Sequence, residues 1–406
     1  MSDSNLVALA ETAAYLIGLP KPIPEIIHEA NLEATSLIAM YGYPAENHSI
    51  TTIDGYILTH HRIPYGKNET VNNKTAIPVL IVHGMNSASL HAFDNGPVSL
   101  GLISFVLADN GYDVWLANLR SSSYSSHSTL TRQEQKFWDF SLSDMAVRDL
   151  APLIDYALNK TGFSKISYVG QSMGTSVMFF LLAEKPEYNE KISGYIALGP
   201  ALIPNYITAI IKILFIPQLL YVVRNQFNVH SLLTVSPLVQ RLQLIFCPSD
   251  YPIICQIGMF INGGYSPNLP DVARIPVHTT HCSGGMSVKT LLHYGQMIQT
   301  QKFRKYDYGN IENLRQYGSA EPPELSIANI KVPTILMYGA NDAVTTSLGV
   351  EIAKRTLPNV VEAILLQNPM ATHSDYMFSK NGKEFLYDEI VVYLKRFLTN
   401  YYPLKN

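Results

Sequence analysis

A serine between two glycines is the clearest sign of chemistry in this chain. Residues 166–169 form an apolar run with β character, Ser172 stands in Gly170-Gln-Ser-Met-Gly174, and a helical apolar run follows over 177–183. A strand, sharp turn and helix in this order raise a serine hydroxyl above the edge of a sheet, because glycines let strand and helix pass closely. The pattern predicts Ser172 as a nucleophile. The alternative is a glycine-rich turn with a serine helix cap.

A serine nucleophile needs a base to take its proton and an acid to orient that base. In the strand–turn–helix class, the chain order is serine, then Asp or Glu, then histidine. Asp342 follows a predicted strand over 334–338, at the carboxyl end where sites of such sheets gather. His373 is the only histidine after Asp342. We therefore predict Asp342 as the orienting acid and His373 as the base. The alternatives are an Asx turn at Asp342 and a structural loop histidine.

Ester or amide chemistry at a serine also needs backbone N–H groups aimed at the developing oxyanion. We predict one donor at Met173, directly after the nucleophile, and a second at Met85, in the loop that follows an early strand over 77–83. In that loop His83 is expected to stabilise the turn. His60 and His61, which fall on opposite faces of a predicted strand, are expected to have structural roles.

Strands and helices alternate along most of the chain, which predicts a mostly parallel sheet with crossover helices. Asp54-Gly55 between two β-rich runs predicts a hairpin over 49–62. Further strands are predicted over 77–83, 111–118, 166–169, 193–198, 334–338 and 361–366, and helices over 31–40, 143–159 and 384–398.

The alternation stops between Pro200 and about Glu321, and we predict a helical cap inserted between two halves of the sheet domain. Lys212 and Pro217 interrupt an apolar stretch over 207–223, so a buried or interface-facing helix is favoured over a transmembrane segment. The predicted division is an N-terminal leader or extension over 1–30, core over 31–200, cap or lid over 201–327, and core over 328–406. The leader is atypical of a signal peptide, because its start is acidic and Glu11 interrupts its apolar part.

Composition excludes some classes of function. The 406 residues are 47% apolar and 15% charged with a net charge of −3, so no nucleic-acid partner is expected. The three cysteines, Cys247, Cys255 and Cys282, show no CxxC spacing and no HExxH motif occurs, so no metal site is expected. Cys247 and Cys255 are near enough to close a small loop, and the alternative is three buried thiols. Candidate glycosylation sites, which lean weakly toward secretion, are Asn47, Asn68, Asn73 and Asn159.

Several blocks of this chain resemble the acid lipase family, which contains gastric and lysosomal acid lipases and many insect relatives. The resemblance runs from about residue 30 to the C-terminus. The matching blocks are residues 41–44, 52–58, 62–66, 113–120, 136–141, 144–146, 339–342 and 373–376.

This resemblance implies an α/β-hydrolase fold with a cap and lid, cleaving neutral lipid esters such as triacylglycerols or sterol esters through an acyl-enzyme. The family triad would fall on Ser172, Asp342 and His373, without a cofactor. The resemblance also implies a disulfide between Cys247 and Cys255. The expected partners are a lipid ester and, transiently, a lipid interface. We expect a monomer that is secreted or lysosomal.

The chain departs from the family pattern beside the nucleophile, where Gln171 and Met173 replace the histidine and glutamine of Gly-His-Ser-Gln-Gly. Ser121 replaces the glycine after Arg120, and an unpaired Cys282 lies in a run that differs from His-x-Pro-Ala-Gly. None of these changes removes a predicted catalytic atom. Two alternatives stay open: a catalytically silent lipid-binding or storage protein that kept the fold, and an esterase for small soluble esters.

Overall fold

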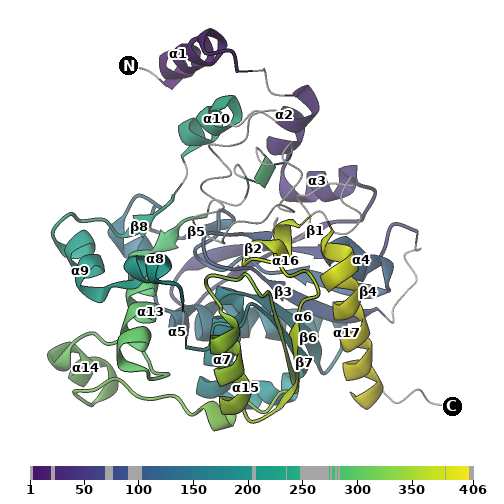
Figure 1. The fold of residues 1–406 in the computed structure, drawn as a ribbon, viewed down its shortest axis with the longest axis vertical. Coiled ribbons are helices and arrows are strands. Elements are labelled where there is room, and N and C mark those ends of the chain that lie inside the picture. The colour runs from purple at the N-terminus through teal and green to yellow at the C-terminus, as the bar shows by residue number, and fades with distance from the viewer. Residues whose placement is uncertain are drawn as a thin grey trace.

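A mostly parallel nine-stranded sheet forms the centre of the computed structural model (Figure 1). The structure describes residues 3–19, 23–68, 76–89, 103–203, 207–234, 236–246, 274, 277–278, 281, 284–379 and 381–401. The strands are β1 (Glu46–Thr51), β2 (Tyr56–Ile63), β3 (Ile77–Val82), β4 (Tyr112–Leu116), β5 (Ser125–His127), β6 (Ile166–Gln171), β7 (Ile192–Leu198), β10 (Thr334–Tyr338) and β11 (Val360–Leu365).

The strand order is β1-β2-β4-β3-β6-β7-β10-β11, and β5 pairs with β2. The pairs that involve β2 are antiparallel, whereas all pairs from β4 to β11 are parallel. Every residue of β4, β6, β7 and β10 is buried, as expected for parallel strands covered on both faces. The predicted hairpin, the predicted strands and the α/β class are thus confirmed.

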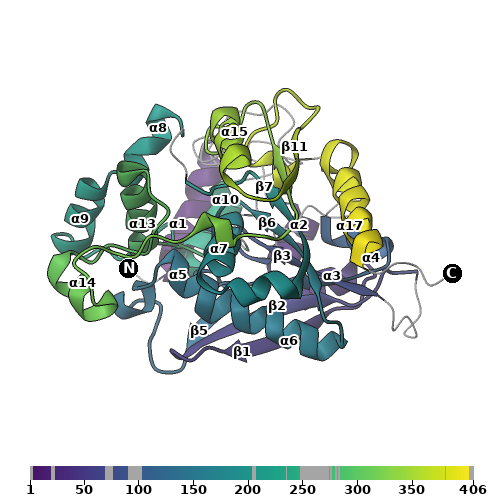
Figure 2. The ribbon, with the colours of Figure 1, turned by 90° about the horizontal axis from the view of Figure 1, so that it is seen from below.

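Helices cover both faces of the sheet (Figures 1 and 2). One hydrophobic core lies beneath α6 (Ala151–Thr161), α7 (Met173–Glu184), α13 (Val288–Thr300) and α15 (Ser347–Thr356). The second core lies beneath α2 (Pro24–Ala30), α3 (Ala34–Met40), α4 (Ile103–Asp109), α16 (Asp375–Phe378) and α17 (Asp388–Tyr401). The helix predicted over 31–40 corresponds to α3.

The helix predicted over 143–159 is present but irregular. A short α5 (Leu142–Asp144) leads into a π-helical stretch, η3 (Met145–Leu150), which continues into α6. Pro152 near the start of α6 has no N–H to donate to the carbonyl four residues earlier, so the regular α-helical pattern of hydrogen bonds is interrupted there. The helix predicted over 384–398 is likewise divided into a π-helical η8 (Lys383–Tyr387) and α17.

A long segment leaves the sheet after β7 and returns at β10, although these two strands are neighbours. We call it the inserted segment. Its described elements are α8 (Ala209–Lys212), η5 (Ile213–Phe215), α9 (Pro217–Asn225), β8 (Ser231–Leu232), α10 (Pro237–Phe246), β9 (Met286–Ser287), α13, α14 (Asn310–Tyr317) and η7 (Ile327–Asn329). The predicted limits of a cap at 201 and 327 stay a prediction.

The N-terminal helix α1 (Asp3–Leu16) lies beside α10, away from the sheet (Figure 1). Several of its apolar side chains, Leu9, Tyr15 and Leu16 among them, are exposed. Among the described residues, no helix combines the length and apolar character needed to cross a membrane.

Candidate active site

Ser172 lies at a sharp turn where β6 ends and α7 begins. Its backbone has φ 52° and ψ −115°, a left-handed conformation that is costly for a non-glycine residue. A Cβ atom added to Gly174 would lie 2.4 Å from the carbonyl oxygen of Val82 in β3. The start of α7 therefore packs against the neighbouring strand as closely as a glycine allows, which holds the strained turn in place.

The structure brings Ser172, Asp342 and His373 together, although they are far apart in the sequence. Nε2 of His373 lies 2.7 Å from Oγ of Ser172, and Nδ1 lies 2.9 Å from Oδ2 of Asp342. Because a carboxylate only accepts hydrogen bonds, Nδ1 carries the proton and Nε2 is left to accept from the serine hydroxyl. Serine, imidazole and carboxylate thus form one continuous hydrogen-bonded chain.

Asp342 is buried and accepts hydrogen bonds on both oxygens. Oδ1 accepts from the backbone N–H groups of Val344 at 2.8 Å and Thr345 at 2.7 Å, and Oδ2 accepts from Thr345 Oγ1 at 2.5 Å and Tyr376 OH at 2.8 Å. Burial opposes the negative charge, but His373 and the bonds from Thr345 outweigh it and hold the pKa of Asp342 below its ordinary value. The bond from Val344 is also the Asx turn considered as an alternative, which is compatible with the predicted role of Asp342.

The two residues predicted as backbone donors lie in loops next to the nucleophile. Met173 is the first residue of α7, where backbone N–H groups have no partner within the helix. A Cβ atom added to Gly84 would lie 2.2 Å from Oε1 of Gln171 and 3.2 Å from Cβ of Ser172, so the loop that holds Met85 passes directly beside the Ser172 turn. Their role as an oxyanion hole stays a prediction.

Two family models match parts of this chain. Residues 34–93 match a family model described as a partial alpha/beta-hydrolase lipase region, and residues 77–246 match one described as the alpha/beta hydrolase fold. Lipase member N of Mus musculus is 32% identical over 377 residues, which cover 91% of this chain and 92% of that protein. This chain belongs to the acid lipase family of α/β-hydrolases. It is therefore an ester hydrolase of the lipase class.

Two further relatives illustrate the range of this acid lipase family. Lysosomal acid lipase/cholesteryl ester hydrolase of Rattus norvegicus is 31% identical over 376 residues, covering 91% of this chain and 92% of that protein. Gastric triacylglycerol lipase of Homo sapiens is 29% identical over 396 residues, covering 96% and 97%. The family resemblance of the sequence blocks is thus confirmed.

The solved structures that resemble this protein show its fold alone, because their sequence identity to it is low. A membrane phospholipase A has a TM-score of 0.51 at 15% identity, with 97% of each chain covered. An epoxide hydrolase from Vigna radiata has a TM-score of 0.50 at 15% identity, with 87% of this chain and 98% of that chain covered. The same fold thus carries different chemistries, so the reaction has to be argued from the site.

The three histidines given structural roles are buried in this acid lipase family member. His83 Nδ1 donates to the carbonyl of Gly84 at 2.7 Å, while Nε2 accepts from the N–H of Leu119 at 3.1 Å, so the ring stabilises the turn before Met85 as predicted. Burial lowers the pKa of His83 to about 4 and that of His60 and His61 to about 3.

The remaining predicted site residues are the glycosylation candidates and the cysteines. Asn47, Asn68 and Asn159 are exposed. Asn73, Cys247, Cys255 and Cys282 lie outside the described residues, so the proposed disulfide stays a prediction. In the described part of the chain, no group of three or more His, Cys, Asp or Glu side chains could hold a metal ion.

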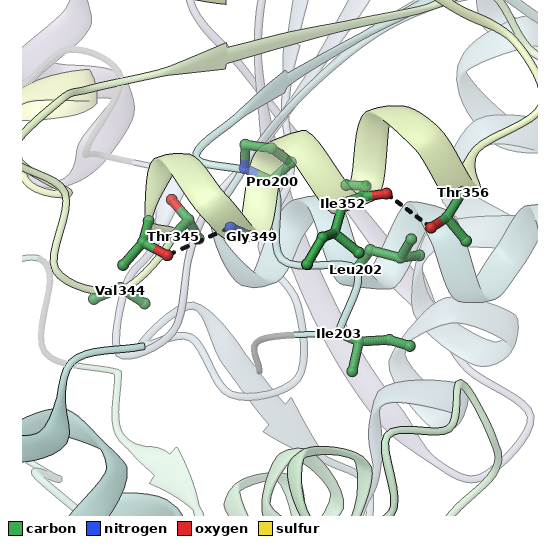
Figure 3. A pocket seen from close by; sticks show the side chains of 10 residues that line it. Pro200, Leu202, Ile203, Val344, Thr345, Gly349, Ile352 and Thr356 are labelled. Atoms are coloured by element: carbon green, nitrogen blue, oxygen red, sulfur yellow. Dashed lines mark hydrogen bonds between the residues drawn. The ribbon is translucent and has the colours of Figure 1, made fainter. Parts of the chain in front are cut away.

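A small apolar pocket lies next to the Asp342 turn, between the residues after β7 and α15 (Figure 3). Its volume is about 50 Å³, whereas ligand pockets measure roughly 300–1,000 Å³. We therefore assign no ligand to it. Its lining includes Pro200, Leu202, Ile203, Val344, Thr345 and Ile352.

Sequence reasoning missed Thr345 and Tyr376, which both bond to the carboxylate of Asp342. Each follows a predicted triad residue by three positions. The short turns at Asp342 and His373 bring their hydroxyls to the same oxygen, and that spacing is the one signal the sequence offered.

Proposed function

We propose that this protein hydrolyses neutral lipid esters, such as triacylglycerols or sterol esters, through Ser172, His373 and Asp342. The observation that carries the proposal is the position of His373, whose ring lies within hydrogen-bonding distance of both the serine hydroxyl and the buried carboxylate. This arrangement fits general-base activation of a serine nucleophile.

In the proposed reaction, Oγ of Ser172 attacks the ester carbonyl while Nε2 of His373 takes the hydroxyl proton. Asp342 keeps the imidazole oriented and stabilises its positive charge, and the N–H groups of Met85 and Met173 donate to the oxyanion. The tetrahedral intermediate collapses as His373 returns the proton to the leaving alcohol. Water then attacks the acyl-enzyme by the same route and releases a fatty acid, so the scheme needs no cofactor.

A group of exposed apolar side chains supports a lipid substrate. We call it the apolar rim, and it belongs to η5, α9 and the turns after them: Ile213, Leu214, Ile216, Leu219, Tyr221, Phe227 and Leu233. Exposed apolar groups gathered on one part of a surface are typical of interaction sites, because contact with a lipid phase removes them from water. We propose that the inserted segment acts as a cap over the site and that this rim meets the lipid interface.

The names of the relatives guide the substrate class and the location. One is named a cholesteryl ester hydrolase and another a triacylglycerol lipase, and their names also refer to the lysosome and the stomach. We propose that this protein is a secreted or lysosomal monomer glycosylated at Asn47, Asn68 or Asn159, which are exposed.

Hydrolysis of nitrophenyl esters of increasing acyl length tests the function. We expect the parent protein to cleave long-chain esters and Ser172→Ala to lose activity by about 10⁴-fold or more. Ser49→Ala, on the exposed face of β1, is the matched control and should keep full activity. Turnover confined to short acyl chains would favour an esterase for small soluble esters. Absence of turnover by the parent protein would favour a silent lipid-binding protein.

A further inference from the structure

The hydroxyl of Tyr376 joins three parts of the proposed site. Tyr376 is fully buried in α16, three residues after His373. Its hydroxyl donates to Oδ2 of Asp342 at 2.8 Å and accepts from the backbone N–H of Gly339 at 2.9 Å. Oδ2 is also the oxygen that accepts from Nδ1 of His373. Tyr376 and His373 therefore share one carboxylate oxygen.

We propose that Tyr376 is a positioning residue that acts through Asp342 to keep His373 neutral, and therefore active as a base, at lower pH. The inference rests on the proposed function, because it concerns the same base. It adds a member to the site that neither the nucleophile pattern nor the order of the triad residues indicates.

The physical reason is the distribution of charge on the carboxylate. Oδ2 accepts from Thr345 Oγ1, Tyr376 OH and His373 Nδ1, so its negative charge is shared among three donors. Each neutral donor reduces the attraction that the oxygen exerts on a protonated imidazole. Removal of one donor would concentrate charge toward His373 and strengthen the attraction between Oδ2 and a protonated imidazole.

Asp342 keeps several contacts that do not involve the tyrosine. Its Oδ1 is held by the backbone N–H groups of Val344 and Thr345. The loop of Asp342 is also bonded to the loop of His373, since the N–H of Asn341 donates to the carbonyl of Ala371 at 3.1 Å. Loss of the Tyr376 hydroxyl should therefore change the charge on the carboxylate more than its place.

The elements next to this pair carry other ionisable groups, and Tyr376→Phe removes none of them. On α16, Asp375 accepts from the N–H and hydroxyl of Thr372, and Ser172 bonds to His373 from the turn before α7. Tyr387 of η8 donates to the backbone carbonyl of Tyr376, a group that phenylalanine also has. From the inserted segment, the ring of His278 packs on Phe378, and at the end of β10 Tyr338 lies near Glu351 of α15.

Tyr376→Phe tests the inference because it removes one oxygen atom. The first measurement is the pH dependence of kcat/KM for p-nitrophenyl butyrate, whose acid limb should move to higher pH by about half a unit. The second is an NMR titration of the Nδ1 proton of His373, which should show the same shift and needs no turnover. Tyr188→Phe is the matched control, because the Tyr188 hydroxyl donates at 2.8 Å to Asp155, an aspartate outside the predicted triad.

A second variant keeps the hydroxyl and strengthens it as a donor. Tyr376→3-fluorotyrosine makes the phenol more acidic, so both the acid limb and the NMR titration should move to lower pH. An NMR titration that is the same in the parent protein and in both variants would overturn the inference. The proposed function would fail separately, by absence of turnover in the parent protein, and the NMR titration would still decide the role of Tyr376.

Discussion

The surroundings of Asp342 leave little freedom for substitution. Five donors face its two oxygens, namely two backbone N–H groups, two hydroxyls and one imidazole N–H. In Asp342→Asn, an NH₂ group at Oδ1 would face two backbone N–H donors, so the amide must place its NH₂ at Oδ2, where it donates to the hydroxyls or to Nδ1 of His373 and favours the wrong tautomer. We expect kcat to fall on the order of 10⁴-fold, because the imidazole loses the partner that fixes its tautomer.

The measurement for Asp342→Asn is kcat for a nitrophenyl ester, with circular dichroism to establish that the variant is folded. Asp155→Asn is the control, because Asp155 also accepts from a tyrosine hydroxyl, that of Tyr188, but lies outside the proposed site. A folded Asp342→Asn that keeps more than a tenth of the parental kcat would contradict the proposed role of the acid.

At the residue scale, the sequence predicted the groups whose order and neighbours are constrained. Ser172 was marked by its glycines, and His373 was the one histidine available after Asp342. Thr345 and Tyr376 are ordinary residue types, and their contact with Oδ2 depends on how two separate turns fold against each other. Such a contact leaves no pattern in a single sequence, because the hydroxyls and the carboxylate belong to loops that meet in space.

At the scale of the elements, the site depends on the close approach of α7 to β3. We predict that Gly174→Ala destabilises the protein by about 1–3 kcal/mol and removes most of the activity. The added methyl group would lie 2.4 Å from the carbonyl oxygen of Val82, and backbone atoms cannot rotate away, so α7 and Ser172 must move. Urea unfolding and ester hydrolysis measure the two effects.

Gly162→Ala is the control for this variant. It places a methyl group where no atom lies within 4 Å, and it carries only the strain of φ 76° at the end of α6, about 1 kcal/mol. We expect it to lose stability while keeping its activity. Equal loss of activity in both variants would show that lower stability alone, and not a displaced Ser172 turn, accounts for the loss.

The elements differ from their prediction where hydrogen bonding changes without a change in apolar pattern. The helix predicted over 143–159 has the expected buried face, and its π-helical stretch over Met145–Leu150 shifts that face only slightly. The spacing of apolar residues predicts that a helix is present. It does not show whether one turn contains an additional residue, as a π-helical turn does. The strands were easier to predict, because β3 is apolar along its whole length and β4 and β6 are mostly apolar.

At the scale of the whole molecule, the alternation of strands and helices predicted the sheet but not the course of the inserted segment. This segment includes α13, which is part of the main core, where Tyr294 donates to Ser176 of α7 at 2.7 Å. A helix outside the strand–helix alternation can still pack on the sheet domain. The apolar period of the sequence does not distinguish such a helix from one that lies apart from the sheet domain.

Four buried histidines connect the stability of the whole molecule to pH. His60, His61, His83 and His293 are at most 3% exposed, and burial lowers their pKa values to about 3, 3, 4 and 4. His60, His83 and His293 each accept a hydrogen bond from a backbone N–H, which a protonated ring could not do at that nitrogen. The fold therefore requires these rings to be neutral.

The sign of the effect follows from proton binding. The unfolded chain binds protons at these rings below about pH 6.5, whereas the folded chain binds them only near pH 3 to 4. Their contribution to stability is thus complete above about pH 6.5 and is lost as the pH falls toward 4, at up to about 1.4 kcal/mol per pH unit for each histidine. Asp342, whose pKa is lowered, adds a further loss only below about pH 4.

We therefore predict that the unfolding temperature falls steadily between pH 7 and pH 4.5, as measured by calorimetry at constant ionic strength. His293→Gln, which removes one titrating ring from the core, should make the pH dependence shallower even though the protein is less stable at pH 7. His28→Gln, at an exposed position on α2, should leave the pH dependence unchanged. A parental unfolding temperature that is constant across this range would contradict the prediction. It would mean that the folded chain binds protons at these rings as readily as the unfolded chain does, although three of the rings use a nitrogen to accept from a backbone N–H group.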